Sequence, residues 1–206
     1  MTRKSVIHVV EDDGAMRESL VELLEESGYM VRGYRRAEEL LARGTAIEPG
    51  CIVSDVRMPG MDGLTLLRRL RAGGSTMPLI LITGHGDVSM AVAAMKAGAV
   101  DFLEKPFEAD ALLDALVTAL HRSPGSDKAE DSELSRQLLQ KLTSREHEVL
   151  GQLVAGKSNK EIAAQLNISP RTVEFHRAHI MEKTAAKGLP ELVRIWLSAD
   201  LSPSTK

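Results

Sequence analysis

Carboxylates, a hydroxyl group and a lysine follow successive short apolar runs in the first half of the sequence. Glu11–Asp13 follow one run, and Asp55 ends another. Thr83 ends a third run, and Lys105 follows the last. Neighbouring carboxylates repel one another unless a cation lies among them, and hard carboxylate oxygens select Mg²⁺. A lysine and a hydroxyl beside that cation suit an anion, so the set predicts phosphoryl transfer to the carboxylate of Asp55.

The runs that carry these residues alternate with helical patterns. Apolar runs predict strands over 6–10, 31–34, 51–55, 78–83 and 100–103. Apolar residues at helical spacing predict helices over 15–27, 37–42, 63–72, 88–97 and 108–121. This alternation predicts an α/β fold with a doubly wound five-stranded parallel sheet. Because ligands of such sheets bind at the carboxyl ends of the strands, we expect the polar residues to converge there; the alternative is a solvated acidic rim.

The composition is that of an ordinary globular protein and excludes several classes. Of the 206 residues, 43% are hydrophobic but only 3% are aromatic, so the core must be aliphatic. The single cysteine, Cys51, excludes an internal disulfide and a cysteine-rich metal cluster, and it fits a reducing compartment. No apolar run reaches the roughly 18 uncharged residues that a membrane span needs. We therefore expect a cytoplasmic protein with no membrane partner.

Charge and composition divide the chain into two modules. Residues 1–121 hold 13 Lys or Arg against 18 Asp or Glu, whereas residues 139–206 hold ten against seven. Between them, polar residues surround a Pro-Gly pair, a composition typical of a linker. After residue 133, the apolar spacing predicts a short helix with Leu134, Leu138, Leu139 and Leu142 on one side. The sequence thus predicts a first domain over residues 1–122, a linker over 123–138 and a small all-helical second domain over 139–206.

The second module contains only helical patterns. Thr143 and Glu146 have the spacing of a capping box at the start of a first helix. A second helical pattern ends at the tight turn 167–169, Pro170 begins the third, and a fourth covers 189–197. Two short helices joined by a tight turn are typical of a helix-turn-helix, whose second helix enters the major groove of DNA.

The first module resembles the receiver domain of two-component response regulators over about residues 4–121. The resemblance rests on Glu11–Asp13, Asp55–Gly60, Asp62–Gly63, Thr83–Gly84 and Lys105–Phe107. It implies a flavodoxin-like fold, phosphorylation at Asp55, and Mg²⁺ held by Glu11, Asp12, Asp55 and the backbone carbonyl of Arg57. Asp13 leaves the register of the acid pair open, although counting back from Met16 favours Glu11 and Asp12.

The same resemblance assigns roles to residues at the ends of the last two strands. Thr83 and Lys105 would hold the phosphoryl oxygens, and Lys105-Pro106 would be a cis peptide. Phe102 stands where the family keeps an aromatic residue that switches together with Thr83; plain packing at the sheet edge is the alternative.

The second module resembles the effector domain shared by LuxR- and NarL-type regulators over about residues 142–200. The matching motifs are Leu142–Leu150, Gly156–Ala163, Ile168–His176 and Lys183. Residues expected to contact double-stranded DNA are Lys160, Arg171, Thr172, Val173, Glu174, His176, Arg177 and Lys183. For Val173 the alternative is a place in the core. The whole chain most resembles the FixJ-type response regulators.

These resemblances imply a bacterial transcription factor that a partner sensor histidine kinase activates by phosphorylating Asp55. Promoter DNA and RNA polymerase would be its output partners. Its own phosphotransfer and slow autodephosphorylation would be its only catalysis, so we do not expect an enzyme. One alternative is a phosphate sink or adaptor without DNA output. Another is a phosphatase with an aspartate nucleophile, but that would need a second carboxylate where Arg57 stands.

The helix predicted over 88–97 is a candidate surface for a homodimer that forms on phosphorylation. We expect Ala91, Val92 and Met95 to point outward from it. The predicted contact residues are Val88, Val92, Met95, Lys96 and Asp101. Apolar and oppositely charged residues in one patch suit a self-complementary two-fold contact, and an ordinary solvated helix face is the alternative.

Overall fold

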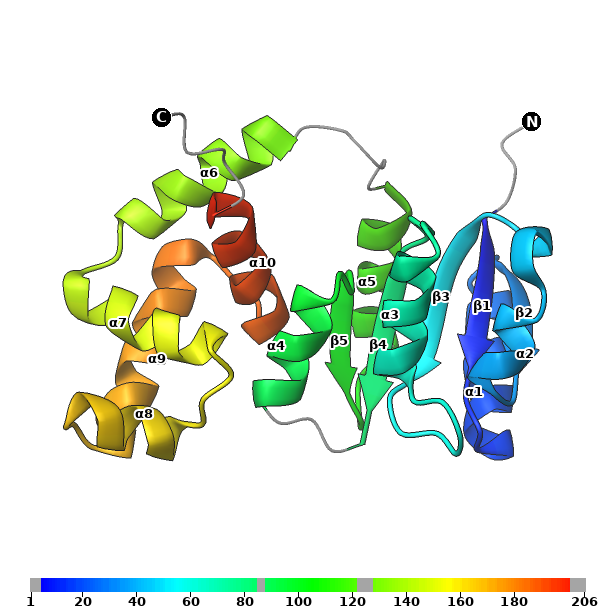
Figure 1. Cartoon of the computed structure of the whole chain (residues 1–206), viewed down its shortest axis with the longest axis horizontal. Coiled ribbons are helices and arrows are strands. Elements are labelled where there is room, and N and C mark those ends of the chain that lie inside the picture. Colours follow the sequence, from blue (N-terminus) through cyan, green and yellow to red (C-terminus); the bar gives the residue numbers. More distant parts are fainter. Residues whose placement is uncertain (1–4, 85–87, 122–127, 201–206) are drawn as a thin grey trace. The chain divides into compact units, whose positions relative to one another are not determined.

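The computed structural model describes residues 5–84, 88–121 and 128–200 of the chain (Figure 1). These residues form two compact units. The first unit contains the parallel sheet and most of the helices of the first module. The second unit contains the helical module together with the helix that starts at Val88.

The sheet confirms the predicted strands and their parallel pairing. Its strands are β1 (Val6–Val10), β2 (Met30–Tyr34), β3 (Gly50–Asp55), β4 (Leu79–Thr83) and β5 (Asp101–Glu104). Their order is β2-β1-β3-β4-β5, and all neighbours are parallel. The chain adds β2 on one side of β1 and β3 on the other. The switch point, where ligands of such sheets bind, therefore lies between the carboxyl ends of β1 and β3.

Aliphatic side chains form the core between the sheet and two helices. The helices of this unit are α1 (Gly14–Glu26), α2 (Ala37–Leu41), α3 (Gly63–Ala72), α5 (Ala109–His121) and a 3₁₀ turn, Gly44–Ala46. Alternate strand residues such as Ile7 and Val53 pack against Leu24 of α1 and Leu116 of α5. The strands β1, β3 and β4 are buried on both faces, which explains why they read as apolar runs without alternation.

The second unit contains the predicted helix-turn-helix. Its helices are α4 (Val88–Lys96), α6 (Lys128–Gln140), α7 (Ser144–Val154), α8 (Asn159–Leu166), α9 (Pro170–Thr184) and α10 (Leu189–Asp200). Thr143 and Glu146 form the predicted capping box. Asn167, in the left-handed region with φ 53°, ends α8, and Ser169 caps α9. Among the described helices, none has the length and apolar character needed to cross a membrane.

Much of the segment that we predicted as a linker is helical instead. From Lys128 onward it forms α6, which packs against α10. The buried side of α6 carries Ser132, Ser135 and Leu139, whereas Leu134, which we had placed on its apolar side, is exposed. The prediction failed because serine is usually an exposed residue, yet it is small enough to fit under a neighbouring helix.

The outward face predicted for α4 is also wrong. Ala91, Val92 and Met95 are only 5%, 3% and 5% exposed, and α4 packs against α10. The helix carries a single charged residue, Lys96, so most of its surface is apolar enough to be buried. Lys96 is the exposed member of the predicted dimer patch, whereas Asp101 is half-buried.

Candidate functional sites

An acidic cluster lies at the switch point of the sheet. Glu11 directly follows β1 and Asp55 ends β3. Together with Asp12, each offers a carboxylate oxygen, and these oxygens lie within 4.8 Å of one another. Glu11 and Asp55 are 3% and 7% exposed, and Asp12 is half-buried. Arg17 Nη1 donates to the Glu11 carbonyl at 2.7 Å, which ties α1 to the turn that carries the acids.

Asp13, the third acid of the run, is engaged in a different role. Its Oδ1 accepts a hydrogen bond from Met16 N at 2.8 Å, so Asp13 is the N-cap of α1. Its own backbone N–H donates to Glu11 Oε1 at 3.3 Å. A capping carboxylate satisfies a free N–H of the first helical turn, and this use of Asp13 leaves Glu11 and Asp12 as the pair nearest Asp55.

Lys105 connects the two buried carboxylates. Its Nζ donates to Glu11 Oε2 and to Asp55 Oδ1, both at 2.7 Å. Burial raises the pKa of Glu11, and the bond from Lys105 offsets only part of that effect. Burial lowers the pKa of Lys105, but hydrogen bonds to Asp55 and Glu11 outweigh it, so that pKa is raised and the ammonium stays charged. The peptide Lys105-Pro106 is cis, which confirms the prediction.

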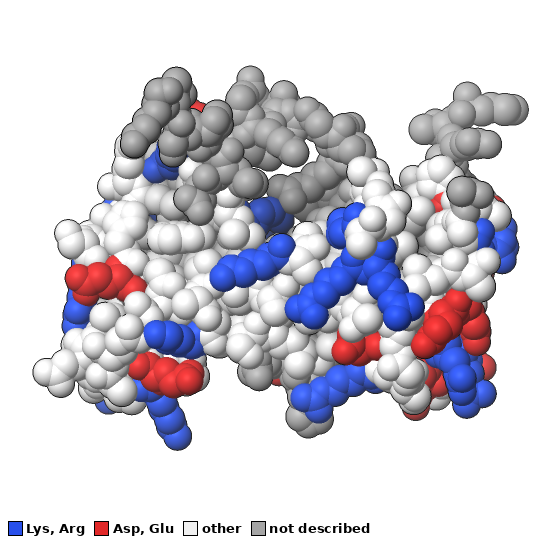
Figure 2. Space-filling view, viewed as in Figure 1, with Lys and Arg blue, Asp and Glu red and all other residues white. Residues whose placement is uncertain are grey.

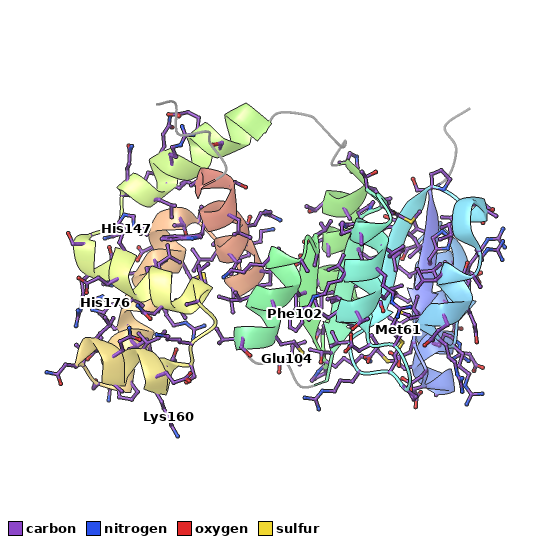
Figure 3. All side chains as sticks on the ribbon, viewed as in Figure 1. Met61, Phe102, Glu104, His147, Lys160 and His176 are labelled. Carbon is purple, nitrogen blue, oxygen red and sulfur yellow. The ribbon has the colours of Figure 1, made fainter. Side chains whose placement is uncertain are left out.

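The loop between β3 and α3 holds the second oxygen of Asp55. Arg57 N donates to Asp55 Oδ2 at 2.6 Å, while the Arg57 side chain is exposed. Gly63 starts α3 so close to the strand that a Cβ there would lie 2.3 Å from the Asp55 carbonyl oxygen. Farther along the loop, Met61 N donates to Glu38 Oε1 of α2 at 3.0 Å (Met61 is labelled in Figure 3). Glu38 was not predicted as part of the site, because nothing near it in the sequence indicates a partner more than 20 residues away.

Thr83 and Phe102 lie on the neighbouring strands. Thr83 is fully buried at the end of β4, whose previous residue pairs with Asp55, so it belongs to the same edge of the sheet. Phe102 on β5 pairs with Leu81 and is buried (Figure 3). Lys105 N donates to the Thr83 carbonyl at 2.7 Å, which aligns the two residues predicted to hold a phosphoryl group.

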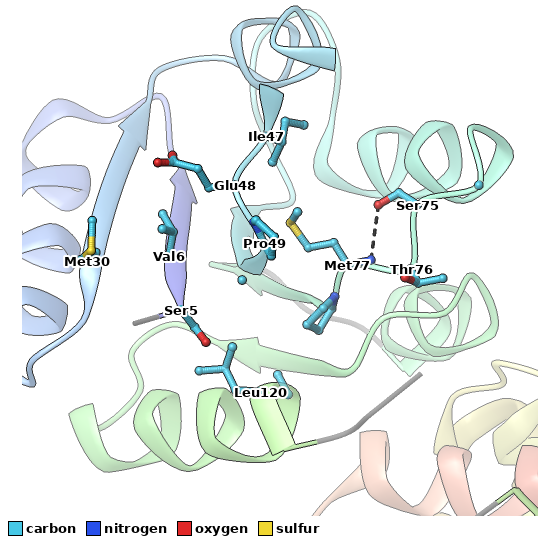
Figure 4. A pocket seen from close by; sticks show the side chains of 14 residues that line it. Ser5, Val6, Met30, Ile47, Glu48, Pro49, Ser75, Thr76, Met77 and Leu120 are labelled. Carbon is cyan, nitrogen blue, oxygen red and sulfur yellow. Dashed lines mark hydrogen bonds between the residues drawn. The ribbon is translucent and has the colours of Figure 1, made fainter. Parts of the chain in front are cut away.

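A cavity of about 780 Å³ in the first unit lies away from this cluster (Figure 4). Its lining comes from the amino-terminal ends of β1 and β3, the loop before β4 and the end of α5. Val6, Pro49, Met77 and Leu120 are among its apolar lining residues. Since the acids and Lys105 lie at the opposite ends of the strands, the cavity has no part in the chemistry of Asp55.

Basic side chains are distributed unevenly over the two units. Figure 2 shows Lys and Arg gathered over α3, where Arg68 and Arg69 are exposed, although the first module is acidic in total. In the second unit Lys160 on α8 and Arg171 on α9 are exposed (Lys160 is labelled in Figure 3). Local charge is therefore a better guide to an anionic partner than the total for each module.

The predicted DNA contacts fall into two groups in the structure. Lys160, Arg171 and Glu174 are exposed, and Thr172 and His176 are half-buried on the same helix-turn-helix. These residues surround the start of α9, the end that enters a groove in this motif. Three others are directed into the unit: Val173, Arg177 and Lys183.

Each of these three residues has a place or a partner inside the unit. Val173 is fully buried, so the core alternative holds for it. Arg177 Nη1 donates to Asn159 Oδ1 at 2.7 Å, and burial lowers the pKa of Arg177. Lys183 Nζ donates to both oxygens of buried Glu146, at 2.9 and 2.7 Å. The family motif shows that a lysine occurs at this position. It does not show whether that lysine contacts DNA or pairs with a buried acid.

Three exposed residues of α9 were not predicted: Phe175, Ala178 and Glu182. After Pro170, the exposed residues of this helix are Arg171, Glu174, Phe175, Ala178 and Glu182. Their spacing is that of one helix face. Phe175 and Ala178 escaped notice because apolar residues are read as core. Their register, two and five residues past buried Val173, was the available signal.

Comparison with known proteins matches both units. Residues 7–117 match the family described as response regulator receiver domain, and residues 140–196 match the bacterial regulatory proteins, luxR family. The transcriptional regulatory protein FixJ of Azorhizobium caulinodans is 50% identical over 96% of this chain and 94% of its own length. FixJ of Rhizobium meliloti is 47% identical over 96% and 98%. The crystal structure of full-length FixJ from B. japonicum is 44% identical, with a TM-score of 0.57 and coverage of 98% and 100%.

Proposed function

Because this chain belongs to the FixJ-like response regulators, with a receiver domain followed by a LuxR-type DNA-binding domain, we propose that phosphorylation of Asp55 controls its binding to DNA. The observation that carries the proposal is Lys105, whose ammonium lies 2.7 Å from Asp55 beside the second acid, Glu11. The donor is the phosphohistidine of a partner sensor histidine kinase, the partner that a receiver domain implies.

In the transfer step a carboxylate oxygen of Asp55 forms the new bond to phosphorus. The P–N bond of the donor breaks, and the imidazole leaves with a proton from solvent. Lys105 and the hydroxyl of Thr83 stabilise the negative charge that develops on the phosphoryl oxygens. Attack of water on the acyl phosphate reverses the modification slowly, so the chain catalyses its own phosphorylation and dephosphorylation and turns over no other substrate.

Mg²⁺ fits the acidic cluster. Three carboxylates share the charge of one lysine, and burial disfavours the charged form of Glu11, as its raised pKa indicates. A divalent cation would offset this excess negative charge. Glu11, Asp12, Asp55 and the carbonyl of Arg57 would hold it, and oxygen ligands are those that Mg²⁺ prefers. When bound, the cation neutralises charge on the phosphoryl group.

The output is binding of double-stranded promoter DNA through α9, followed by contact with RNA polymerase. Lys160, Arg171, Thr172, Glu174 and His176 are the proposed DNA contacts. Arg171 and Lys160 are exposed cations, and contacts to phosphates position such a helix on the duplex.

Coupling between the two units would run through Thr83, Phe102 and a homodimer that forms on phosphorylation. Dimerisation through Val92 and Met95 would require their exposure, because both are buried in the chain. Lys96 is the exposed residue of that patch, so it is the one that a second copy of the chain would contact without rearrangement.

Phosphorylation of the full chain by a small phosphodonor tests the proposal directly. Intact mass is measured with and without Mg²⁺, and affinity for a selected DNA duplex is measured with and without beryllofluoride. We expect Mg²⁺-dependent addition of one phosphoryl group and tighter DNA binding in the wild type, and neither in Asp55→Asn. Unaltered phosphorylation of Asp55→Asn would exclude this acceptor. Phosphorylation with no DNA binding in any state would favour a phosphate sink instead.

A further inference from the structure

The exposed face of α9 contains an apolar patch where a solvated helix would be polar. Phe175 is 57% exposed, and it is the only aromatic residue among the large exposed hydrophobics of the described chain. Ala178, one turn further along, is also exposed. Arg171, Glu174 and Glu182 complete the same face, so the two apolar residues lie within a polar surround. An exposed apolar patch with a polar rim is a feature of surfaces that contact another molecule.

Two histidine rings of the same helix lie next to the Phe175 ring. Its centroid lies 4.1 Å from that of His179 and 6.0 Å from that of His176. His179 Nδ1 in turn lies 4.0 Å from buried Glu146 Oε1. The Phe175 ring therefore packs on His179, which itself contacts buried Glu146, and the opposite face of the Phe175 ring makes neither contact. A side chain already held in place loses less conformational freedom when it binds.

The major groove offers one apolar group on its base edges, the C5-methyl group of thymine. Phe and Ala are among the residues that contact this methyl. We propose that Phe175, together with Ala178, recognises a thymine methyl in the operator of this protein. The inference rests on the proposed DNA-binding function and assigns it a determinant of sequence specificity that has no charge and makes no hydrogen bond.

The polar neighbours fit this role. Arg171 and Glu174 precede Phe175 toward the amino-terminal end of α9, the end that reaches base edges in this motif. Glu182 lies two turns beyond Phe175 on the same face. A contact with a second copy or with RNA polymerase is the other use of an exposed aromatic residue, and it would not depend on the thymine methyl.

Replacing thymine by uracil in the operator tests the proposal, since it removes only the methyl group. The operator is first selected from random duplexes with the full-length wild-type chain in beryllofluoride. Each thymine is then replaced singly by deoxyuridine, and affinity is measured by fluorescence anisotropy. We expect one position in each half-site where the wild type binds uracil about fourfold more weakly, the effect of one buried methyl group. Phe175→Ala should lose most of this difference at that position, because only Ala178 of the pair remains.

Matched variants keep the test specific. Glu182→Ala changes another exposed residue of the same face and should retain the discrimination between thymine and uracil. Phe175→Leu keeps an apolar side chain and should retain part of it; this variant serves if Phe175→Ala binds too weakly. Because Phe175 is exposed, neither change should alter folding, which Trp196 fluorescence checks in the same unit.

The possible outcomes distinguish failure of the thymine contact from failure of the proposed DNA binding. A wild-type chain that selects no duplex would contradict the DNA-binding proposal itself. A wild-type chain that selects a duplex but never distinguishes thymine from uracil would overturn only the role of Phe175. If Phe175→Ala still distinguishes thymine from uracil as well as the wild type does, the proposed role of Phe175 is overturned too. The same holds if Phe175→Ala loses the dimer in sedimentation but keeps the thymine preference.

Discussion

Lys183 has two competing roles, a DNA contact expected from its place in the sequence motif and an internal ion pair seen in the structure. Its ammonium lies 2.7 Å from Glu146 Oε2, and Glu146 is 3% exposed. Thr143 donates to the same oxygen through its backbone N–H and its hydroxyl. The His179 ring also faces this carboxylate. We therefore predict that Lys183→Met destabilises the second unit and leaves the phosphate contacts unchanged.

The pKa of Glu146 provides the magnitude. Burial alone would raise this pKa, but hydrogen bonds from Lys183 and Thr143 lower it to about 2, from an ordinary value of 4.5. That difference corresponds to about 3 kcal/mol in favour of the ionised form. Thr143 supplies part of it, and the Lys183 side chain is 34% exposed, so solvent screens its charge. Lys183→Met should lower the free energy of unfolding by about 1–2 kcal/mol at neutral pH.

The pH dependence has a definite sign. Because the folded state has the lower pKa, the stabilisation by ionised Glu146 is complete above about pH 4.5 and disappears as pH falls toward 2. In Lys183→Met the pKa of Glu146 rises, so this loss should become smaller. The difference in stability between wild type and variant should therefore be largest at neutral pH and decrease in acid.

Urea unfolding followed by tryptophan fluorescence measures this effect. Trp196 is the only tryptophan of the chain and lies on α10 of the second unit, so its signal reports on that unit. Lys160→Met is the matched control, since it removes an exposed lysine from α8. It should change stability by less than about 0.5 kcal/mol. In DNA binding it should lower the slope of log affinity against log salt by about one, whereas Lys183→Met should not.

The opposite pattern would refute the reasoning. If Lys183→Met unfolds at the wild-type urea concentration and loses salt dependence on DNA, Lys183 contacts a phosphate and its bond to Glu146 contributes little. Glu146→Gln provides a second check, because it removes the charge but keeps hydrogen-bond acceptors. It should abolish the acid-dependent loss of stability in both the wild-type and Lys183→Met backgrounds.

Three further predictions concern the receiver domain. Glu11→Gln should weaken Mg²⁺ binding in calorimetry, whereas Asp13→Ala should leave it unchanged and lower stability by about 1 kcal/mol through loss of a helix cap; the reverse result would shift the acid pair by one residue. Glu38→Ala should slow phosphorylation of Asp55 severalfold by freeing the loop at Met61, and Glu38→Gln should largely restore the rate measured with a small phosphodonor. Lys96→Glu should prevent dimerisation in sedimentation while phosphorylation proceeds normally; dimers of this variant would place the interface elsewhere.

The fold was predictable because each signal depended on the local chain. In the first module the strand and helix limits agree with prediction within one residue, since apolar periodicity and capping residues act over short stretches. The convergence of Glu11, Asp12, Asp55 and Lys105 was also predictable, because parallel strands place their carboxyl ends at one edge of a sheet. The short helix expected after the polar segment is part of α6, which begins earlier, at Lys128; its burial under α10 was not visible in the sequence.

The exposed side chains of α9 were harder to predict, because this helix both packs against the unit and presents a face proposed to contact DNA. Its inner face must pack against α7 and α8, and Val173, Ile180 and Thr184 meet that demand. In the proposed function its outer face meets a groove that carries both polar and methyl groups, and exposed Phe175 and Ala178 lie on that face. Polarity therefore does not separate the two faces of this helix, whereas register does. Counting from buried Val173 assigns Phe175 to the outer face, and this rule applies to any recognition helix whose core positions are known.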